Sequence, residues 1–306
     1  MEGELLKYGG PELWRVLAAI INGIFATHES VEELKHGYII PLNKPPKPCN
    51  ISNIRPLVLL TMMRKVLSRV VLTRITEDTE AYLSQGQHAY RTGRSTSEAV
   101  LTMQWICATT ERYAERVRIM GIDLSKAFDC LNRHKLRQIM RENGIGSVDD
   151  ERMICYLLSE TKLMVKLEGK VGSMFPTETG TPQGDSLSPV LFLVYLEHIL
   201  RGYPRQDLIR SNRAVEIAYA DDVIIAMREA RDEGGQARHE YREECTCVRC
   251  DMETLERTLP AQFARYDMQM NAGKKVRGEV GPQENTIPAV LGCELNGMKE
   301  VVARRR

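Results

Sequence analysis

The chain has 306 residues and a net charge of +1, with 43% hydrophobic residues and eight cysteines. This length can bury a substantial core, as one large or two modest domains. It contains no run of eighteen apolar residues and opens with MEGELLKYGG, so neither a transmembrane helix nor a signal peptide is expected. Cysteines without a secretory signal favour free thiols inside the cell. Residues 43–118 hold twelve Lys and Arg against six Asp and Glu, a bias that suits a phosphate-facing surface or a solvated helical face.

The N-terminal region predicts a helix followed by a strand. Apolar residues recur at helical spacing over residues 12–25. Residues 37–42 read as a strand, and the turn-rich NKPPKP after it carries Lys44 and Lys47.

The next segment predicts a second strand and a long helix. Residues 51–60 form an apolar run in which Pro56 indicates a sheet edge or an irregular entry, since proline cannot donate to the ladder. Helical spacing covers residues 62–75. The basic residues of this helix are expected largely off its apolar side: Arg64, Lys65, Arg69 and Arg74.

A polar loop over residues 83–94 precedes a third predicted helix. Ser95 with Glu98 three residues later matches a capping box, so a helix is expected to run to about residue 110. Residues 117–123 then form a short apolar strand that ends in an acid.

The middle of the chain predicts a helix over 132–141 and a hairpin over 163–167 and 174–178. Residues 180–187 form a glycine-containing loop. Ser188 and Pro189 match an N-cap followed by proline in the first helical turn. The helix after them, up to residue 200, is strongly apolar and expected to be buried.

Two adjacent acids interrupt the apolar run 215–226. The β-branched flanks 215–218 and 223–226 predict paired strands, with Asp221 and Asp222 at the hairpin tip. Asp-Asp at a turn is common, because Asp tolerates turn geometry and water. Two acids held by apolar flanks are costly without a neutralising cation, which favours a divalent metal.

The C-terminal region predicts one helix and one strand. Residues 228–249 are charged and cysteine-bearing, typical of a mobile insertion. Helical spacing returns over 254–270, residues 271–286 read as a polar loop, and 289–295 as a final strand.

Asp123, Asp221 and Asp222 all lie at strand ends or turns. Mg²⁺ takes oxygen ligands and keeps positions for water and substrate phosphates. Two such ions stabilise the attacking and leaving oxygens of an in-line displacement. Nucleotide transfer to a primer hydroxyl is such a displacement.

Segments in this order resemble the motifs of reverse transcriptases of non-LTR (LINE-type) retrotransposons and the related group II intron enzymes. GIDLSKAFD (121–129), TGTPQGDSLSPVLFLVYL (179–196) and AYADDVII (218–225) are similar to three successive palm motifs. GYIIPLNKP, ISNIRPLVLLTMMRKVLSRVV and QGQHAYRTGRSTSEAV resemble the fingers, and LLKYGG the extension before them. MNAGKK and VLGCEL resemble the last palm motifs. The resemblance covers nearly the whole chain.

The resemblance implies that Asp123 and Asp221 bind two Mg²⁺ ions, which Mn²⁺ can replace, with Asp222 assisting and the Leu124 carbonyl as a further ligand. It implies that Phe128 stacks under the incoming sugar and excludes a 2′-hydroxyl. Without the motif around it, ordinary core packing would explain Phe128.

Further residues match the family's nucleotide-binding positions. Arg55 would bind the triphosphate through its planar fork, and Gln183 and Gly184 would contact the nucleotide or template. Lys44, Lys47 and Lys65 are candidate helpers or merely solvated. Lys274, next to Lys275, would donate a proton to the leaving pyrophosphate.

A polar, aromatic and basic cluster is fit for the template backbone and base stacking. Its members are Gln87, Tyr90, Arg91 and Arg94.

A separate cysteine cluster leaves two readings open. Cys245, Cys247 and Cys250, with His239 upstream, offer four ligands for a tetrahedral zinc site. The spacing is not that of a common finger, so three surface thiols are the alternative.

The expected fold is α+β, a right-hand polymerase with an antiparallel palm sheet flanked by helices. The N-terminal extension and fingers would occupy residues 1–116 and the palm 117–306. Helices and a hairpin would interrupt the palm at 131–178, and the charged insertion at 228–253. A thumb is not recognised, so the sequence is expected to be a fragment or a relic that binds duplex weakly.

The expected function is RNA-directed DNA synthesis from an RNA template, a DNA primer and dNTPs, with no membrane partner. The compartment would be the nucleus if the element is eukaryotic, and otherwise the cytoplasm. The alternatives are a catalytically idle RNA-binding scaffold and an RNA-dependent RNA polymerase. The intact acids argue against the first, and Phe128 against the second.

Overall fold

A computed structural model describes residues 3–27, 31–43, 54–159, 161–202, 214–229, 248–271, 276–280 and 285–286. The chain divides into two compact units. Unit 1 comprises Met1–Tyr82 and Phe128–Tyr195, and unit 2 comprises Leu83–Ala127 and Leu196–Arg306. The predicted division at residue 116 stays a prediction. Among the described residues, no helix has both the length and the apolarity to cross a membrane.

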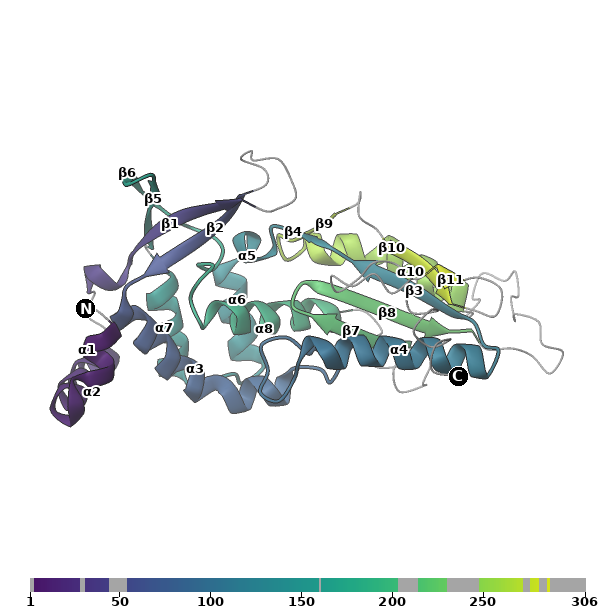
Figure 1. Cartoon of the computed structure of the whole chain (residues 1–306), viewed down its shortest axis with the longest axis horizontal. Coiled ribbons are helices and arrows are strands. Elements are labelled where there is room, and N and C mark those ends of the chain that lie inside the picture. Colours follow the sequence, from purple (N-terminus) through teal and green to yellow (C-terminus); the bar gives the residue numbers. More distant parts are fainter. Residues whose placement is uncertain are drawn as a thin grey trace. The chain divides into compact units, whose positions relative to one another are not determined.

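Unit 1 contains a four-stranded sheet in the order β2-β1-β5-β6 (Figure 1). Its strands are β1 (His36–Asn43), β2 (Ile54–Leu60), β5 (Lys162–Leu167) and β6 (Lys170–Pro176). β2 is an edge strand, as Pro56 predicts, and its Pro56 faces Pro41 of β1. The predicted hairpin is β5–β6, whose second strand begins four residues earlier than expected.

The other regular elements that the structure describes in unit 1 are helices. They are α1 (Gly3–Tyr8), α2 (Gly10–Thr27), η1 (Glu32–Leu34), α3 (Met62–Tyr82), α6 (Arg133–Glu142) and α7 (Val148–Leu158). The short α5 (Ala127–Cys130) and the apolar α8 (Ser188–Arg201) continue from one unit into the other. The prediction of a buried helix after Ser188 is confirmed, since Leu191 to Leu196 are at most 1% exposed.

One expectation for α3 is wrong. Arg64 does not lie off the buried side, because its side chain is 0% exposed. Helical spacing had counted it among the solvated residues, since a charged side chain is rarely buried unless it is paired. The buried Asp185 carboxylate beside Arg64 offsets the cost of this burial.

Unit 2 is built on a five-stranded antiparallel sheet in the order β11-β10-β3-β8-β7 (Figure 1). Its strands are β3 (Val117–Ile122), β7 (Ala214–Tyr219), β8 (Asp222–Arg228), β10 (Val276–Val280) and β11 (Asn285–Thr286). A small second sheet pairs β4 (Leu124–Ser125) with β9 (Gln269–Met270). The polar loop predicted over 271–286 is therefore wrong, because it contains β10 and β11.

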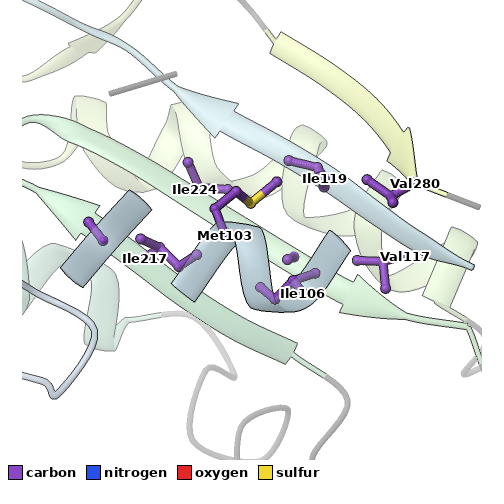
Figure 2. Packing of buried hydrophobic residues seen from close by; sticks show 9 residues of the cluster. Met103, Ile106, Val117, Ile119, Ile217, Ile224 and Val280 are labelled. Carbon is purple, nitrogen blue, oxygen red and sulfur yellow. The ribbon is translucent and has the colours of Figure 1, made fainter. Parts of the chain in front are cut away.

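Helices cover the large sheet of unit 2. α4 (Thr96–Arg112) packs Met103 and Ile106 against Val117 and Ile119 of β3 and against Ile224 of β8 (Figure 2). Side chains alternate along a strand, so Val223 and Ile225 point to the opposite face. Both are at most 1% exposed, and α10 (Val248–Ala264) contacts β3 and β8. Burial on both faces explains why these strands read as continuous apolar runs.

Two details of the helices in unit 2 differ from the sequence prediction. Ser95 is the N-cap of α4 but makes no side-chain cap bond, so the predicted capping box is wrong. The Glu98 carboxylate lies instead 3.3 Å from His88 Nδ1 and 3.9 Å from Arg94. α10 begins at Val248, inside the stretch assigned to the insertion, and ends at Ala264 rather than near Met270.

Candidate active site

The adjacent acids of unit 2 lie at a tight hairpin turn, as predicted. β7 and β8 pair up to Tyr219 and Asp222, which leaves Ala220 and Asp221 as the two turn residues. Ala220 has a φ of 57°, in the left-handed region that residues other than glycine seldom adopt. The backbone at the acids is therefore strained and has to be held by its surroundings.

The strand register brings the third acid to the same end of the sheet. β3 and β8 are antiparallel and pair Ile122 with Val223. The pairing ends there, so Asp123 and Asp222 are the next residues along the two strands. The three carboxylates of the predicted metal site thus belong to one end of one sheet.

Asp123 is anchored on its other side by Asn271. The Asn271 side-chain amide donates to Asp123 Oδ2 over 3.1 Å, and its backbone N–H donates to the Asp123 carbonyl over 2.9 Å. The pairing of β4 with β9 leads directly into this contact. Asn271 lies in the MNAGKK segment, but its type and spacing gave no sign of a partner 148 residues away.

The donor set fits Mg²⁺ by its chemistry, since three carboxylates and the nearby Leu124 carbonyl offer only oxygen ligands. Within the described part of the chain, no three His, Cys, Asp or Glu side chains are already gathered as a metal cage. Like charges close together disfavour one another, so cations would be needed to draw the carboxylates together. Strand pairing thus determines where the three acids lie, and their carboxylates offer the oxygen ligands.

The loop 83–94 of unit 2 lies beside this turn and carries the predicted template-binding cluster. Its members differ in burial. Gln87 and Arg91 are buried, and the Arg91 guanidinium donates to the Ser84 and Gln87 carbonyls over 2.6 and 3.2 Å. Tyr90 is 53% exposed. Burial raises the pKa of the Tyr90 phenol, and Tyr219 and Asp221 raise it further.

Arg94, the fourth member of that cluster, is partly exposed and donates to the Gln85 side chain over 2.6 Å. Tyr90 and Arg94 thus keep surface that a nucleic acid can reach, whereas the side chains of Gln87 and Arg91 are buried.

In unit 1, the loop 180–187 is seated on β2. The Val58 N–H donates to the Gln183 carbonyl over 2.6 Å. Gly184 has a φ of 127°, and a Cβ there would overlap the Val58 carbonyl oxygen. That Cβ would also lie 3.5 Å from the Leu57 side chain. Arg55 is exposed and lies two residues before Leu57, on the same face of the strand and about 7 Å away.

The buried Asp185 anchors the second half of this loop. Asp185 accepts from the Ser68 hydroxyl over 2.9 Å and from the Leu187 N–H over 3.2 Å. Its Oδ2 lies 3.6 Å from Arg64 Nε, and Arg64 Nη1 donates to the Leu34 carbonyl over 2.9 Å. Burial lowers the pKa of Arg64, and Asp185 opposes that shift.

Sequence reasoning missed this Asp185–Arg64 pair. An acid directly after Gln183 and Gly184, in an otherwise uncharged motif, was the available signal.

Phe128 lies next to the start of the loop 180–187. Its ring centroid is 4.6 Å from that of the buried Phe192, with the rings tilted by 31°, and its own side chain keeps partial exposure. The Phe128 carbonyl accepts the Thr181 N–H over 3.0 Å. Arg133 donates to the carbonyls of Thr177, Thr179 and Gly180 over 2.6–3.0 Å. Burial lowers the pKa of Arg133 to about 10, and repulsion from Arg64 adds to the shift.

Several predicted residues lie outside the described residues: Lys44, Lys47, Lys274, Lys275, His239, Cys245 and Cys247. Lys65 is partly exposed on α3. Cys250, the remaining member of the possible zinc site, lies in the first turn of α10 with partial exposure. The zinc site stays a prediction.

Comparison with known proteins identifies the family. Residues 42–276 match the model of the family described as reverse transcriptase (RNA-dependent DNA polymerase). The probable RNA-directed DNA polymerase from transposon X-element of Drosophila melanogaster is 23% identical over 69% of this chain and 23% of its own length. The polymerase from mobile element jockey of Drosophila funebris is 23% identical over 84% of this chain and 27% of its own length. The chain thus spans about a quarter of the length of these curated relatives.

A solved structure shows the same fold. Apo telomerase from Candida tropicalis, truncated from its C-terminal domain, superposes with a TM-score of 0.57 at 13% identity, over 88% of this chain and 55% of that one. The predicted α+β polymerase fold with an antiparallel sheet is confirmed. The chain belongs to the reverse transcriptase (RNA-dependent DNA polymerase) family, and its homologues are the polymerases of non-LTR retrotransposons.

Proposed function

We propose that this domain catalyses Mg²⁺-dependent, RNA-templated DNA synthesis by nucleotidyl transfer to a primer 3′-hydroxyl. The observation that carries the proposal is the pairing of β3 with β8 up to Ile122 and Val223, which makes Asp123 and Asp222 the next residues at the end of the sheet where Asp221 forms the turn. Together with family membership, this arrangement supplies the oxygen ligands that phosphoryl transfer requires.

The reaction is a single displacement at phosphorus. The primer 3′-oxygen bonds to the α-phosphorus of the dNTP as the bond from that phosphorus to the bridging oxygen breaks. Pyrophosphate leaves, and the hydroxyl proton passes to water. Asp123, Asp221, Asp222 and the Leu124 carbonyl would hold two Mg²⁺ ions, which neutralise charge on the attacking and leaving oxygens. Lys274 would protonate the leaving pyrophosphate.

The nucleotide-binding residues belong to the other unit. Arg55 would bind the triphosphate, with Lys44 and Lys65 as helpers, and the loop of Gln183 and Gly184 would contact the nucleotide. The buried Phe192 packs against the Phe128 ring, so Phe192 restricts movement of that ring away from a nucleotide bound on its exposed side. A rigid aromatic wall of this kind would reject a ribose 2′-hydroxyl.

RNA is proposed as the template. One solved relative, telomerase from Candida tropicalis, is described in complex with a fragment of telomeric RNA, at a TM-score of 0.54 and 11% identity. On this chain, Tyr90 and Arg94 combine an exposed aromatic ring with a cation on one loop. Such a pair suits base stacking and backbone contact.

Primer extension on an RNA template tests the proposal, with Asp221→Asn compared with wild type. Loss of one ligand charge removes several kcal/mol of charge stabilisation, so extension is expected to fall on the order of 10³-fold. The matched control is Asp149→Asn, an exposed acid on α7 paired with Arg152, which is expected to extend like wild type.

Two other outcomes would reject DNA synthesis. RNA binding without any dNTP incorporation by the wild type would favour a scaffold. A preference for NTPs would favour an RNA polymerase.

A further inference from the structure

We propose that Gln87 is a positioning residue that sets the backbone of the Ala220–Asp221 turn, and through it the catalytic carboxylates. The inference rests on the proposed function for its catalytic consequence. The structural claim, that the Gln87 side chain holds the turn at Ala220, depends only on contacts within unit 2.

The Gln87 side-chain amide satisfies both backbone groups of Ala220. Its Oε1 accepts the Ala220 N–H over 3.1 Å, and its Nε2 donates to the Ala220 carbonyl over 3.3 Å. The same Oε1 accepts the Ala89 N–H over 3.1 Å. Two backbone donors aimed at one atom fix the orientation of the amide, because a flipped amide would place an NH₂ group against both. The side chain thus serves Ala220 as a neighbouring strand would.

The backbone around Gln87 is held against the same strand. The Ala218 N–H donates to the Gly86 carbonyl and the His88 N–H donates to the Ala218 carbonyl, both over 2.8 Å. A Cβ at Gly86 would overlap the Glu216 carbonyl oxygen, so only glycine allows this approach. Gln87 therefore reaches the turn from a support that is already fixed.

The turn needs such a support. Ala220 keeps a left-handed backbone without being glycine, and its side chain is buried. If Gln87 were removed, the N–H and C=O of Ala220 would lose the partners that offset this strain.

Asp221 follows Ala220 directly, so a rotation of the Ala220 backbone would displace the Asp221 carboxylate. Displacements of about 1 Å at a reacting centre can cost on the order of 10²-fold in rate. Gln87 would act without touching substrate or metal. This differs from the template contact expected from the sequence.

Hydrogen exchange by mass spectrometry tests the hold on the turn in Gln87→Ala. Loss of one hydrogen bond is expected to speed exchange of the Ala220 amide by about tenfold, while β3 amides such as that of Ile119 keep their protection. A general loss of stability would instead speed exchange throughout the sheet. Gln85→Ala, an exposed glutamine of the same loop, is the matched control and should leave Ala220 unchanged.

Metal and RNA binding separate positioning from template contact. Mn²⁺ binding followed by electron paramagnetic resonance, and the Mg²⁺ concentration needed for half-maximal extension, should both shift toward weaker binding in Gln87→Ala. RNA affinity measured without metal should stay within about twofold. Gln87→Glu keeps an oxygen acceptor for the Ala220 N–H but sets a second oxygen against the Ala220 carbonyl and adds a buried charge, so its Ala220 exchange should also rise above that of wild type.

Unchanged Ala220 exchange in both variants would overturn the inference. So would a loss of RNA affinity with unchanged Mn²⁺ binding, which would return Gln87 to the template. If Gln87→Ala does not fold, Gln87→Glu carries the same comparisons. If the wild type incorporates no dNTP, the proposed function fails, whereas the exchange and Mn²⁺ measurements still decide whether Gln87 holds the turn.

Discussion

The turn at Ala220 and Asp221 in unit 2 and the loop 180–187 in unit 1 are held by different forces. A neutral amide and backbone hydrogen bonds hold the turn. The loop is held by charged side chains: the buried Asp185 lies beside Arg64, and the half-buried Arg133 donates to the carbonyls of Thr177, Thr179 and Gly180. A hairpin already satisfies most of its own backbone groups, so one neutral partner completes it. An irregular loop lacks that ladder and needs stronger, charge-assisted donors and acceptors.

The largest effect is expected from removing the charge that holds the loop. Asp185→Ala leaves the buried Arg64 uncompensated and should destabilise the protein by about 3–5 kcal/mol, measured by urea unfolding. The exposed Asp149→Ala should cost no more than about 0.5 kcal/mol.

A double variant, Arg64→Met with Asp185→Leu, should recover most of that loss, because apolar residues of similar volume often replace a buried ion pair without penalty. A cost below about 1 kcal/mol for Asp185→Ala alone would show that charge does not hold the loop, and the contrast with the turn would disappear.

An intermediate effect is expected from the two glycines that allow close backbone approach, one for each region. Gly184→Ala should raise the KM for dNTP, whereas Gly86→Ala should lower kcat, each by about tenfold, which corresponds to about 1.4 kcal/mol. Steady-state primer extension measures both. Gly172→Ala, where a Cβ would meet only an ordinary 3.6 Å contact, should change neither constant. If both variants shift the same constant, the two regions do not have separate tasks.

An effect of similar size concerns sugar choice on the loop side. Phe128→Ala should reduce discrimination against ribonucleotides by about tenfold, read from the ratio of kcat/KM for dNTP and NTP. Phe175→Ala, an exposed ring on β6, should leave that ratio unchanged. Lower stability with unaltered discrimination would make Phe128 a packing residue of Phe192 alone.

The sequence predicts the hairpin side of this contrast better than the loop side. Alternating and β-branched runs predict β3, β7 and β8, and the pairing of these strands leaves Asp123 and Asp222 as the next residues at one end of the sheet. The helices α2, α3, α4, α6 and α8 follow from apolar spacing and from Ser188-Pro189.

Long-range pairing of polar residues was not predictable from local pattern. Arg64 reads as solvated until Asp185, 121 residues later, is known to lie beside it. The position of α7 was not predicted, because the acids of its first turn pair with bases on other helices: Asp150 with Arg74, and Glu151 with Arg137 and Arg141. The Ser95 motif matched a capping box, but His88 and Arg94 compete for Glu98.

β7 lies at one edge of its sheet, and the contacts of Gly86 and His88 with Ala218 affect more than the turn. An edge strand with unpaired N–H and C=O groups is a template on which a strand from another molecule can add. At Ala218 both groups are already taken from within the chain. The domain can therefore keep its acids beside a sheet edge without offering unpaired backbone groups to another molecule at Ala218, and Gly86→Ala would weaken this protection as well as lower kcat.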